Sequence, residues 1–150
     1  MTITYRQATS DDYDLTFKIK SDSLKPYIEQ TWDWDTDVQL KYHLDNFKPP
    51  HALLIMYEGE MVGYVEFVET EQAVELKNIL IDNKYQSRGI GTFVITGFID
   101  DTTKKGKVLT LEVLGVNSRA KKLYELLGFS VIGERDKKIL MVYHPRDHVT

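Results

Sequence analysis

Cysteine is absent from this chain of 150 residues, which excludes disulfides, a thiol nucleophile and every metal site built on cysteine. Long hydrophobic runs are also missing, since no apolar segment approaches the roughly 20 residues that a membrane-spanning helix needs. The first six residues lack the apolar centre of a signal peptide. We therefore expect a cytoplasmic protein with no membrane partner.

Histidine and positive charge are both scarce. Lys and Arg number 19 against 23 Asp and Glu, a formal net charge of -4, and no basic stripe with interleaved aromatics is present. Pro145 interrupts the only histidine pair at i, i+4 spacing. The sequence thus predicts no metal site and no nucleic-acid partner, and its acidity suits a small or cationic partner. The four histidines are His43, His51, His144 and His148.

Hydrophobic periodicity predicts one domain over residues 1–150, with 42% hydrophobic residues to build its core. Strands are expected at residues 3–7, 52–57, 61–70, 74–82, 108–114, 129–133 and 139–143. An amphipathic helix begins after Thr9, and residues 23–47, which include Pro26, are expected to form two short helices around a turn near residues 33–35. Further helical stripes cover residues 90–99 and 120–127. The order β-α-α-β-β-β-α-β-α-β-β indicates an α/β (α+β) fold, a mixed sheet with helices on its faces.

The most informative segment is a polar turn with two glycines, Gly89 and Gly91, between a buried strand and an amphipathic helix. Glycine lets the backbone come close to a ligand. The first N–H groups of a helix have no partners within it, and they lie at the positive end of its dipole. A phosphate or pyrophosphate therefore fits at this turn.

The spacing of the two glycines distinguishes this turn from other glycine-containing phosphate-binding loops. A Walker loop needs Gly-Lys-Ser/Thr, and here Thr92 and Phe93 follow Gly91. A dinucleotide fingerprint needs a third glycine where Val94 stands, although Glu112 lies at the offset of that fold's ribose-binding acid. A loop that only turns the chain into a helix remains an alternative.

Two ordered motifs resemble those of a known family. Residues 86–91, Gln-Ser-Arg-Gly-Ile-Gly, match the pattern Q/R-x-x-G-x-G/A, and residues 117–129 resemble N-x-x-A-x-x-L-Y-x-x-x-G-F. The chain is therefore similar to the GNAT superfamily of N-acetyltransferases, which bind acetyl-CoA. The close resemblance covers about residues 74–129, while residues 1–50 match only in outline. It implies a mostly antiparallel seven-stranded sheet and a single N-acetyltransferase domain.

The resemblance also implies where acetyl-CoA lies. The pantetheine arm is expected to pair with an exposed strand edge formed by Ile79, Leu80 and Ile81, which needs backbone groups rather than particular side chains. Asn117 would cap the following helix and reach the pantetheine, or act as a cap only. Arg88 adds a positive charge or stays solvated. The pyrophosphate would rest on the backbone of Gln86, Ser87, Arg88, Gly89, Ile90, Gly91 and Thr92.

Two proton transfers accompany acetyl transfer from a thioester to an amine, so an acid and a base are expected. The resemblance places Tyr124 at the thioester sulfur, where a phenol with a pKa of about 10 can protonate the leaving thiolate. Alternatively, Tyr124 is an aromatic residue that packs in the core. The base is expected at Glu75, where several family members carry a glutamate, and a solvated strand-end carboxylate is its alternative. A period of two puts Glu75 on one side with Lys77, Ile79 and Ile81. Glu66 is the second candidate.

The resemblance implies an acceptor pocket built largely by the segment after the first helix and by the later hairpins. In that segment Tyr27, Trp32 and Trp34 lie close to carboxylates in the sequence. Aromatic faces beside carboxylates suit a cationic amine, although two tryptophans also suit simple packing. A primary amine acceptor is predicted, either a small molecule or a protein N-terminus or lysine. The oligomeric state is expected to be a monomer or a homodimer. An acyl-CoA-binding or sensing module without turnover is the alternative function.

Overall fold

The protein's structure, a computed structural model, describes residues 2–145. Its elements follow one another in the expected order, so that prediction is confirmed. Three short turns of 3-10 helix, η1 (Ser10–Asp12), η2 (Pro49–His51) and η3 (Asn83–Tyr85), link some of them. The main elements are β1 (Ile3–Gln7), α1 (Tyr13–Thr31), α2 (Thr36–Asn46), β2 (Ala52–Tyr57), β3 (Glu60–Glu69), β4 (Ala73–Ile81), α3 (Ile90–Lys105), β5 (Val108–Leu114), α4 (Ser118–Leu126), β6 (Phe129–Arg135) and β7 (Lys138–Tyr143).

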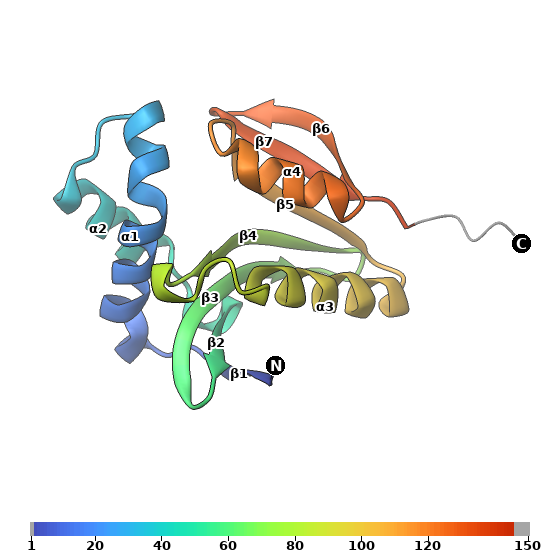
Figure 1. Cartoon of the computed structure of the whole chain (residues 1–150), viewed down its shortest axis with the longest axis horizontal. Coiled ribbons are helices and arrows are strands. Elements are labelled where there is room, and N and C mark those ends of the chain that lie inside the picture. Colours follow the sequence, from blue (N-terminus) through green and yellow to red (C-terminus); the bar gives the residue numbers. More distant parts are fainter. Residues whose placement is uncertain (1, 146–150) are drawn as a thin grey trace, which may run out of the picture.

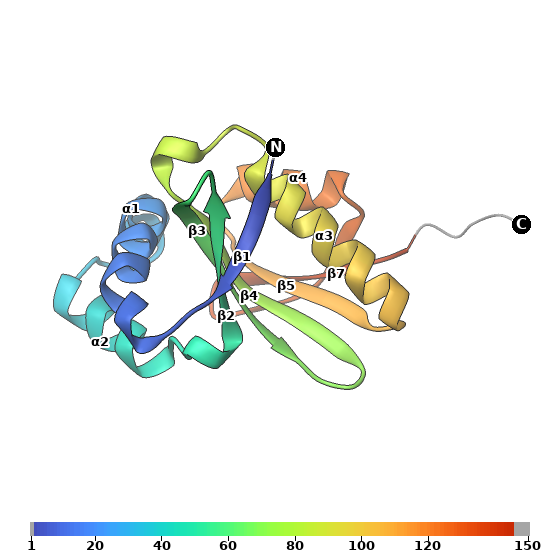
Figure 2. The ribbon, with the colours of Figure 1, turned by 90° about the horizontal axis from the view of Figure 1, so that it is seen from below.

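The seven strands form one sheet in the order β1-β2-β3-β4-β5-β7-β6, and every neighbouring pair is antiparallel except β4 and β5. Figures 1 and 2 show α1 and α2 on one face of the sheet and α3 and α4 on the other. Successive residues of β3 face the two cores, because Tyr64 packs with Ile19 of α1 and Val65 packs with Ile95 of α3. The expected mixed, mostly antiparallel sheet with helices on its faces is confirmed.

The first of the two short helices predicted within residues 23–47 is wrong, because Pro26 lies inside α1, which continues through this residue to its end at residue 31. A proline inside a helix leaves the carbonyl four residues earlier without its N–H donor. Here that carbonyl belongs to Asp22, and the side-chain amide of Asn83 donates to it over 3.4 Å. A contact from the turn after β4 thus supports the longer helix. The turn near residues 33–35 is present, and the Asp35 side chain caps α2.

A β-bulge marks the place where β4 leaves β5. Phe67 and Glu66 of β3 lie opposite Leu76 and Asn78, so Lys77 is an extra residue in β4. The parallel pairing with β5 ends at Leu76. Because a bulge bends its strand and increases the local twist, we attribute the divergence of β4 from β5 to it.

The bulge also breaks the alternation expected along β4. Leu76 and Ile79, three residues apart, pack against the same core, whereas an uninterrupted strand would place them on opposite faces. Glu75 precedes the buried Leu76 and points to the other face. The prediction that Glu75 shares a side with Ile79 and Ile81 is therefore wrong.

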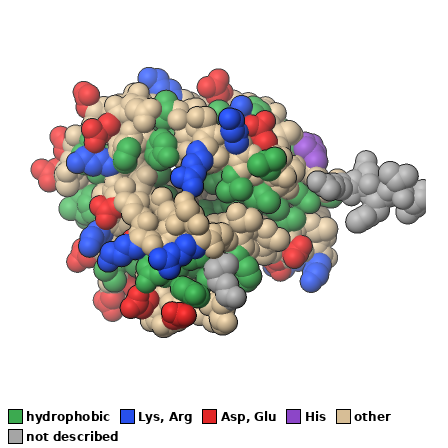
Figure 3. All heavy atoms as spheres, viewed as in Figure 1, with side chains coloured by type: hydrophobic (Ala, Val, Ile, Leu, Met, Phe, Trp, Pro, Cys, Tyr) green, Lys and Arg blue, Asp and Glu red, His purple; other side chains and the backbone are tan. Residues whose placement is uncertain are grey.

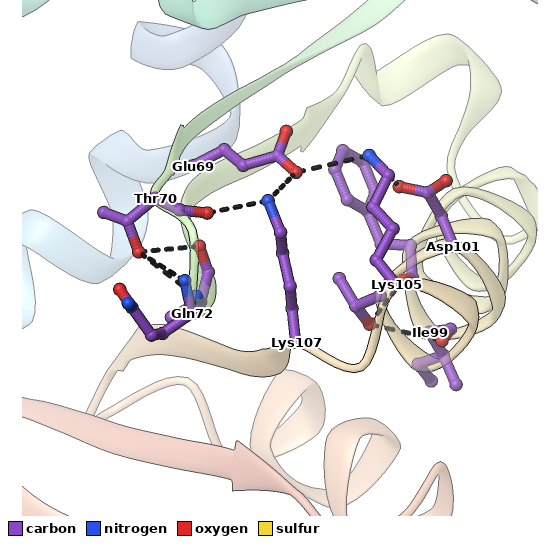
Figure 4. A network of polar contacts seen from close by, with 10 residues as sticks. Glu69, Thr70, Gln72, Ile99, Asp101, Lys105 and Lys107 are labelled. Atoms are coloured by element: carbon purple, nitrogen blue, oxygen red, sulfur yellow. Dashed lines mark hydrogen bonds and ion pairs between the residues drawn. The ribbon is translucent and has the colours of Figure 1, made fainter.

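A polar network holds β4 and β5 together at the opposite end. The Lys107 ammonium donates to the Glu69 carboxylate and to the Thr70 carbonyl, each over 2.7 Å, and Lys105 reaches the same carboxylate over 3.2 Å. Figure 4 shows that these groups connect the β3–β4 turn to the end of α3 and the start of β5. The two strands are thus paired at this end and diverge only at the other.

Gly63 of β3 lies opposite Ile81, where β3 and β4 approach closely. A methyl group on Gly63 would overlap the Leu80 carbonyl and lie 3.1 Å from the Ile81 Cα atom. Since backbone atoms cannot move aside cheaply, we expect Gly63→Ala to lower the free energy of unfolding by about 3 kcal/mol, and the melting temperature by roughly 6–12 °C. Thermal unfolding followed by circular dichroism measures this change.

Gly97 provides the control, because an added methyl group would meet nothing within 4 Å there. Gly97→Ala in the middle of α3 is expected to stabilise the protein by about 0.5–1 kcal/mol. Equal melting temperatures for the two variants would contradict the close approach of β3 and β4 at Gly63.

Candidate active site

The divergence of β4 from β5 opens a cavity of about 320 Å³. Residues 77–80 of β4 and 112–114 of β5 form two of its walls, and side chains of α1, α2 and α4 form the others. Figure 3 shows a hollow between the surfaces of α3 and α4, with hydrophobic side chains around it. The cavity thus lies between two strands of the sheet, within reach of the start of α3.

One edge of β4 faces this cavity without a partner strand. β3 pairs with the other edge as far as Ile81, while pairing with β5 stops at Leu76. A ligand that contains amides can add to such an edge. The Ile81 carbonyl already accepts hydrogen bonds from the Ser23 hydroxyl over 3.1 Å and the Gln86 side-chain amide over 3.0 Å. Of the three predicted edge residues, Ile79 and Leu80 line the cavity and Ile81 does not.

The glycine turn leads directly into α3. Ser87 and Gly89 both have positive φ angles, 63° and 83°, and Gly89 is the N-cap of the helix. Phe93 is the first residue of α3 whose backbone N–H donates a helical hydrogen bond, and its acceptor is the Gly89 carbonyl. Of the N–H groups predicted to bind the pyrophosphate, that of Gln86 donates to the Asn83 carbonyl over 3.4 Å, and those of residues 87–92 are available to an anion. Glycine is needed at position 89 because side chains rarely adopt such a φ angle.

Side chains around the turn hold it in place and add positive charge. Gln86 binds the Ile81 carbonyl and the Asn83 side chain, each over 3.0 Å, so its side chain positions the loop. The Arg88 guanidinium lies 5.2 Å from the centre of the Tyr85 ring. Arg119 of α4 donates to the Ser87 hydroxyl over 2.9 Å. The sequence analysis missed Arg119, although it lies inside the second motif.

Tyr124 and Asn117 lie in the wall that α4 contributes to the cavity. The Tyr124 ring packs edge-on against Phe129 with 6.0 Å between the ring centres. Burial raises the pKa of Tyr124 to about 12, which keeps the hydroxyl protonated at neutral pH. The Asn117 side chain accepts the Ala120 N–H over 3.1 Å and so caps α4, as expected.

A second cavity of about 370 Å³ adjoins the first, and Lys20, Tyr42, Asn78 and Glu112 line both. Glu66 lines only the second cavity, where its carboxylate accepts a hydrogen bond from the Asn78 side chain over 3.1 Å. Burial raises the pKa of Glu66. A carboxyl group with a raised pKa beside a cavity is suited to proton transfer near neutral pH.

The other candidate base lies elsewhere. Glu75 lines neither cavity, and its carboxylate forms a 2.8 Å ion pair with Lys77 while its side chain is 36% exposed. The geometry thus corresponds to the alternative of a solvated carboxylate at the start of the strand. Its role as a base stays a prediction, and Glu66 has the better position.

The predicted acceptor residues are only partly brought together. Trp32 lines the first cavity, but Tyr27 lines neither cavity. Trp34 lies on a separate shallow depression, and its indole N–H donates to the Thr36 hydroxyl over 3.1 Å. The acceptor side of the site therefore owes little to the aromatic and acidic segment around residue 33.

Two groups in the cavity walls were missed by the sequence analysis. Lys20 is buried in α1, where the i, i+4 spacing of Thr16, Lys20, Leu24 and Ile28 is the signal that could have placed it inward. Glu112 of β5 forms ion pairs with three cations at distances of 3.3–3.7 Å, and its side chain is 10% exposed. In the sequence, the only indication of the face that Glu112 occupies was its position between two hydrophobic residues, Leu111 and Val113, which point to the opposite face of β5.

Other kinds of site have less support. Within residues 2–145, no group of three or more His, Asp and Glu side chains lies close enough to hold a metal ion. One of the four histidines, His148, lies outside the described residues. None of the described helices has the length and apolar character to cross a membrane.

Comparison with known proteins gives the same family as the two sequence motifs. The model of the acetyltransferase (GNAT) family matches residues 11–129. The alanine N-acetyltransferase of ribosomal protein bS18 from Escherichia coli is 36% identical over 73 residues, which cover 48% of this chain and 49% of that protein. An uncharacterized N-acetyltransferase of Methanocaldococcus jannaschii is 30% identical over 142 residues, 85% of this chain and 61% of that one. The chain thus spans about half the length of the E. coli relative that it matches.

A solved structure extends the comparison to the fold. The PaiA N-acetyltransferase of Thermoplasma acidophilum, determined in complex with coenzyme A, superimposes with a TM-score of 0.76 at 16% identity, covering 97% of this chain and 100% of that one. The two chains therefore share one fold. The chain belongs to the acetyltransferase (GNAT) family, as the resemblance implied.

Proposed function

We propose that this protein transfers the acetyl group of acetyl-CoA to a primary amine. The observation that carries the proposal is the parting of β4 and β5 after Leu76, because it opens an unpaired strand edge and a cavity beside Tyr124. An amide-rich arm can pair with this edge, and its thioester would then lie in the cavity.

The chain offers groups for each part of the coenzyme. The N–H groups of residues 87–92 would bind the pyrophosphate, with the cationic side chains of Arg88 and Arg119 beside it. Residues 77–80 would pair with the pantetheine arm, and Asn117 faces the same space. When bound, acetyl-CoA supplies an activated thioester carbonyl. A backbone N–H of the open β4 edge would polarise that carbonyl without any side chain.

The reaction forms a C–N bond and breaks the C–S bond. The ammonium nitrogen loses two protons, one before it attacks and one as the amide forms, while the leaving sulfur gains one proton and the other passes to solvent. An ammonium with a pKa of about 10 must lose a proton before it can attack. The Glu66 carboxylate accepts this proton, directly or through a water molecule, since it lines the adjoining cavity. The Tyr124 hydroxyl donates to the sulfur as negative charge develops there.

Both a small amine and a protein N-terminus fit the acceptor side. The similar E. coli enzyme is named for an alanine of a ribosomal protein, which supports a primary amine as the acceptor. The second cavity, of about 370 Å³, has room for a small molecule or for the first residue of a peptide.

Titration calorimetry with CoA and a thiol-release assay with a panel of amines test the proposal. We expect CoA to bind with measurable heat, and at least one amine to raise CoA release from acetyl-CoA well above the rate of hydrolysis. Binding without release on any amine would favour an acyl-CoA sensing module instead. An absence of binding heat would rule out both functions.

A further inference from the structure

Lys20 is the most unusual residue in the walls of the two cavities. Its side chain projects from α1, and the residue is only 8% exposed. It lines both cavities, and its ammonium lies 4.8 Å from the centre of the Tyr42 ring. Lysine is almost never buried to this extent unless it is paired.

No carboxylate within residues 2–145 pairs with this ammonium. The ion pairs closer than 4.0 Å do not include Lys20, and neither do the side-chain hydrogen bonds. Glu66 is near enough to influence Lys20 electrostatically, but its hydrogen-bond partner is Asn78. Burial lowers the pKa of Lys20, as expected for an ammonium that has lost water and gained no counterion. An anion that enters the cavity would supply the missing partner.

The surroundings of Lys20 favour an anion as well. The second cavity is lined by five Lys and Arg residues but only three carboxylates, although the chain as a whole is acidic. Lys77, Arg135 and Lys138 all converge on Glu112, which leaves Lys20 deep in the wall without a fixed partner. This polarity is the reverse of the acidic, aromatic acceptor pocket expected around residue 33.

We propose that the acceptor is the α-amine of a residue with a side-chain carboxylate, and that Lys20 binds this side-chain carboxylate. The assignment rests on the proposed function, since it places the carboxylate in the space that an acceptor would occupy. Lys20 lies where the two cavities meet, so an acceptor held there can present its amine between Glu66 on one side and Tyr124 on the other. A free acidic amino acid and a peptide with an acidic first residue share this chemistry.

Matched pairs of acceptors test the assignment. Aspartate is compared with asparagine, glutamate with glutamine, and a tripeptide amide beginning with aspartate with one beginning with asparagine. Within each pair only a charged carboxylate is replaced by an amide. In the parent protein we expect kcat/KM to be about 10-fold to 100-fold higher for the acidic member, in line with a hydrogen bond to a charged group. If the ratio of kcat/KM between the acidic and the amide member is larger for the free amino acids, the acceptor is a free amino acid. If it is larger for the tripeptides, the acceptor is a peptide.

Substitution of Lys20 shows whether this residue creates the preference. Lys20→Met nearly keeps the length of the side chain and removes its charge. The ratio of kcat/KM for the acidic member to that for the amide member is therefore expected to fall to near one in Lys20→Met, whereas Lys20→Arg should retain most of the preference for the acidic member. Lys25→Met is the matched control, because Lys25 is also on α1 beside an aromatic ring but lines neither cavity. Its ratio should equal that of the parent. Melting temperatures show whether Lys20→Met folds, and the loss of a desolvated charge is expected to leave stability equal or higher.

The outcomes separate the two proposals. Transfer to amines with no preference for the acidic member, or a preference that survives in Lys20→Met, would overturn the role of Lys20 and leave acetyl transfer standing. Failure of every amine in the presence of bound acetyl-CoA would overturn the proposed function, and the assignment of Lys20 with it.

Discussion

Tyr124→Phe is expected to lower kcat by about 100-fold to 1000-fold, with little change in the KM for acetyl-CoA. Tyr124 lines the cavity, and the substitution removes only its hydroxyl and leaves the ring in contact with Phe129. A group that acts on the leaving sulfur interacts with charge that is present only in the transition state. Its loss therefore appears in kcat and not in substrate binding. Steady-state thiol release at saturating amine measures the effect.

The raised pKa of Tyr124 refines its chemical role. The sequence alone suggests a phenol with an ordinary pKa near 10, but burial raises it to about 12. Complete proton transfer from such a phenol to a thiolate with a pKa of about 8.5 is uphill by roughly 5 kcal/mol. We therefore expect Tyr124 to stabilise the sulfur mainly by a hydrogen bond, with solvent delivering the proton afterwards. The parent rate should then show no loss of activity from ionisation of Tyr124 up to about pH 10.

Tyr143 offers a matched control for this variant. It also packs against Phe129, with 5.6 Å between ring centres, but it lines neither cavity. Tyr143→Phe should keep kcat within about twofold of the parent. If Tyr124→Phe also retained kcat to within threefold, Tyr124 would be a packing residue only.

The order of elements and the two motifs were predictable from the sequence because they depend on local chemistry. Periodicity places each strand, the glycines mark a turn into a helix, and Asn117 is a side chain that caps helices readily. These features require no knowledge of what packs against them. The strand order and the identity of the parted strands followed from the resemblance, since spacing alone does not reveal which strands are neighbours.

The missed features all depend on contacts between distant segments. The length of α1 is explained by Asn83, which lies 61 positions beyond the carbonyl that it binds. The bulge at Lys77 is a property of the pairing with β3, and it moved Glu75 to the opposite face from Ile79. The position of Lys20 beside a cavity depends on two strands and three helices that together form its walls. No local pattern in the sequence encodes the first two, and the i, i+4 spacing in α1 places Lys20 on the inward face without revealing the cavity beside it.

Glu66→Gln is expected to lower kcat/KM about 100-fold at neutral pH, because the amide cannot accept the proton of the attacking ammonium. Burial raises the pKa of Glu66, so this group becomes an active base at a higher pH than an exposed glutamate does. The parent rate should therefore rise with pH through this raised pKa and then level off. In the variant the rate should instead climb by about tenfold per pH unit toward the pKa of the amine near 10. The difference between the two proteins then narrows in alkaline solution.

Glu75→Gln separates the two candidate bases in the same experiment. Glu75 lines neither cavity, and its carboxylate is already paired with Lys77, so its variant should keep the pH profile and the neutral rate of the parent. The opposite result, with Glu75→Gln losing the acid limb and Glu66→Gln retaining it, would assign the base to Glu75. It would also require the start of β4 to move toward the cavity when substrates bind, because Glu75 lies on the same face of the sheet as Glu66 but does not line the cavity.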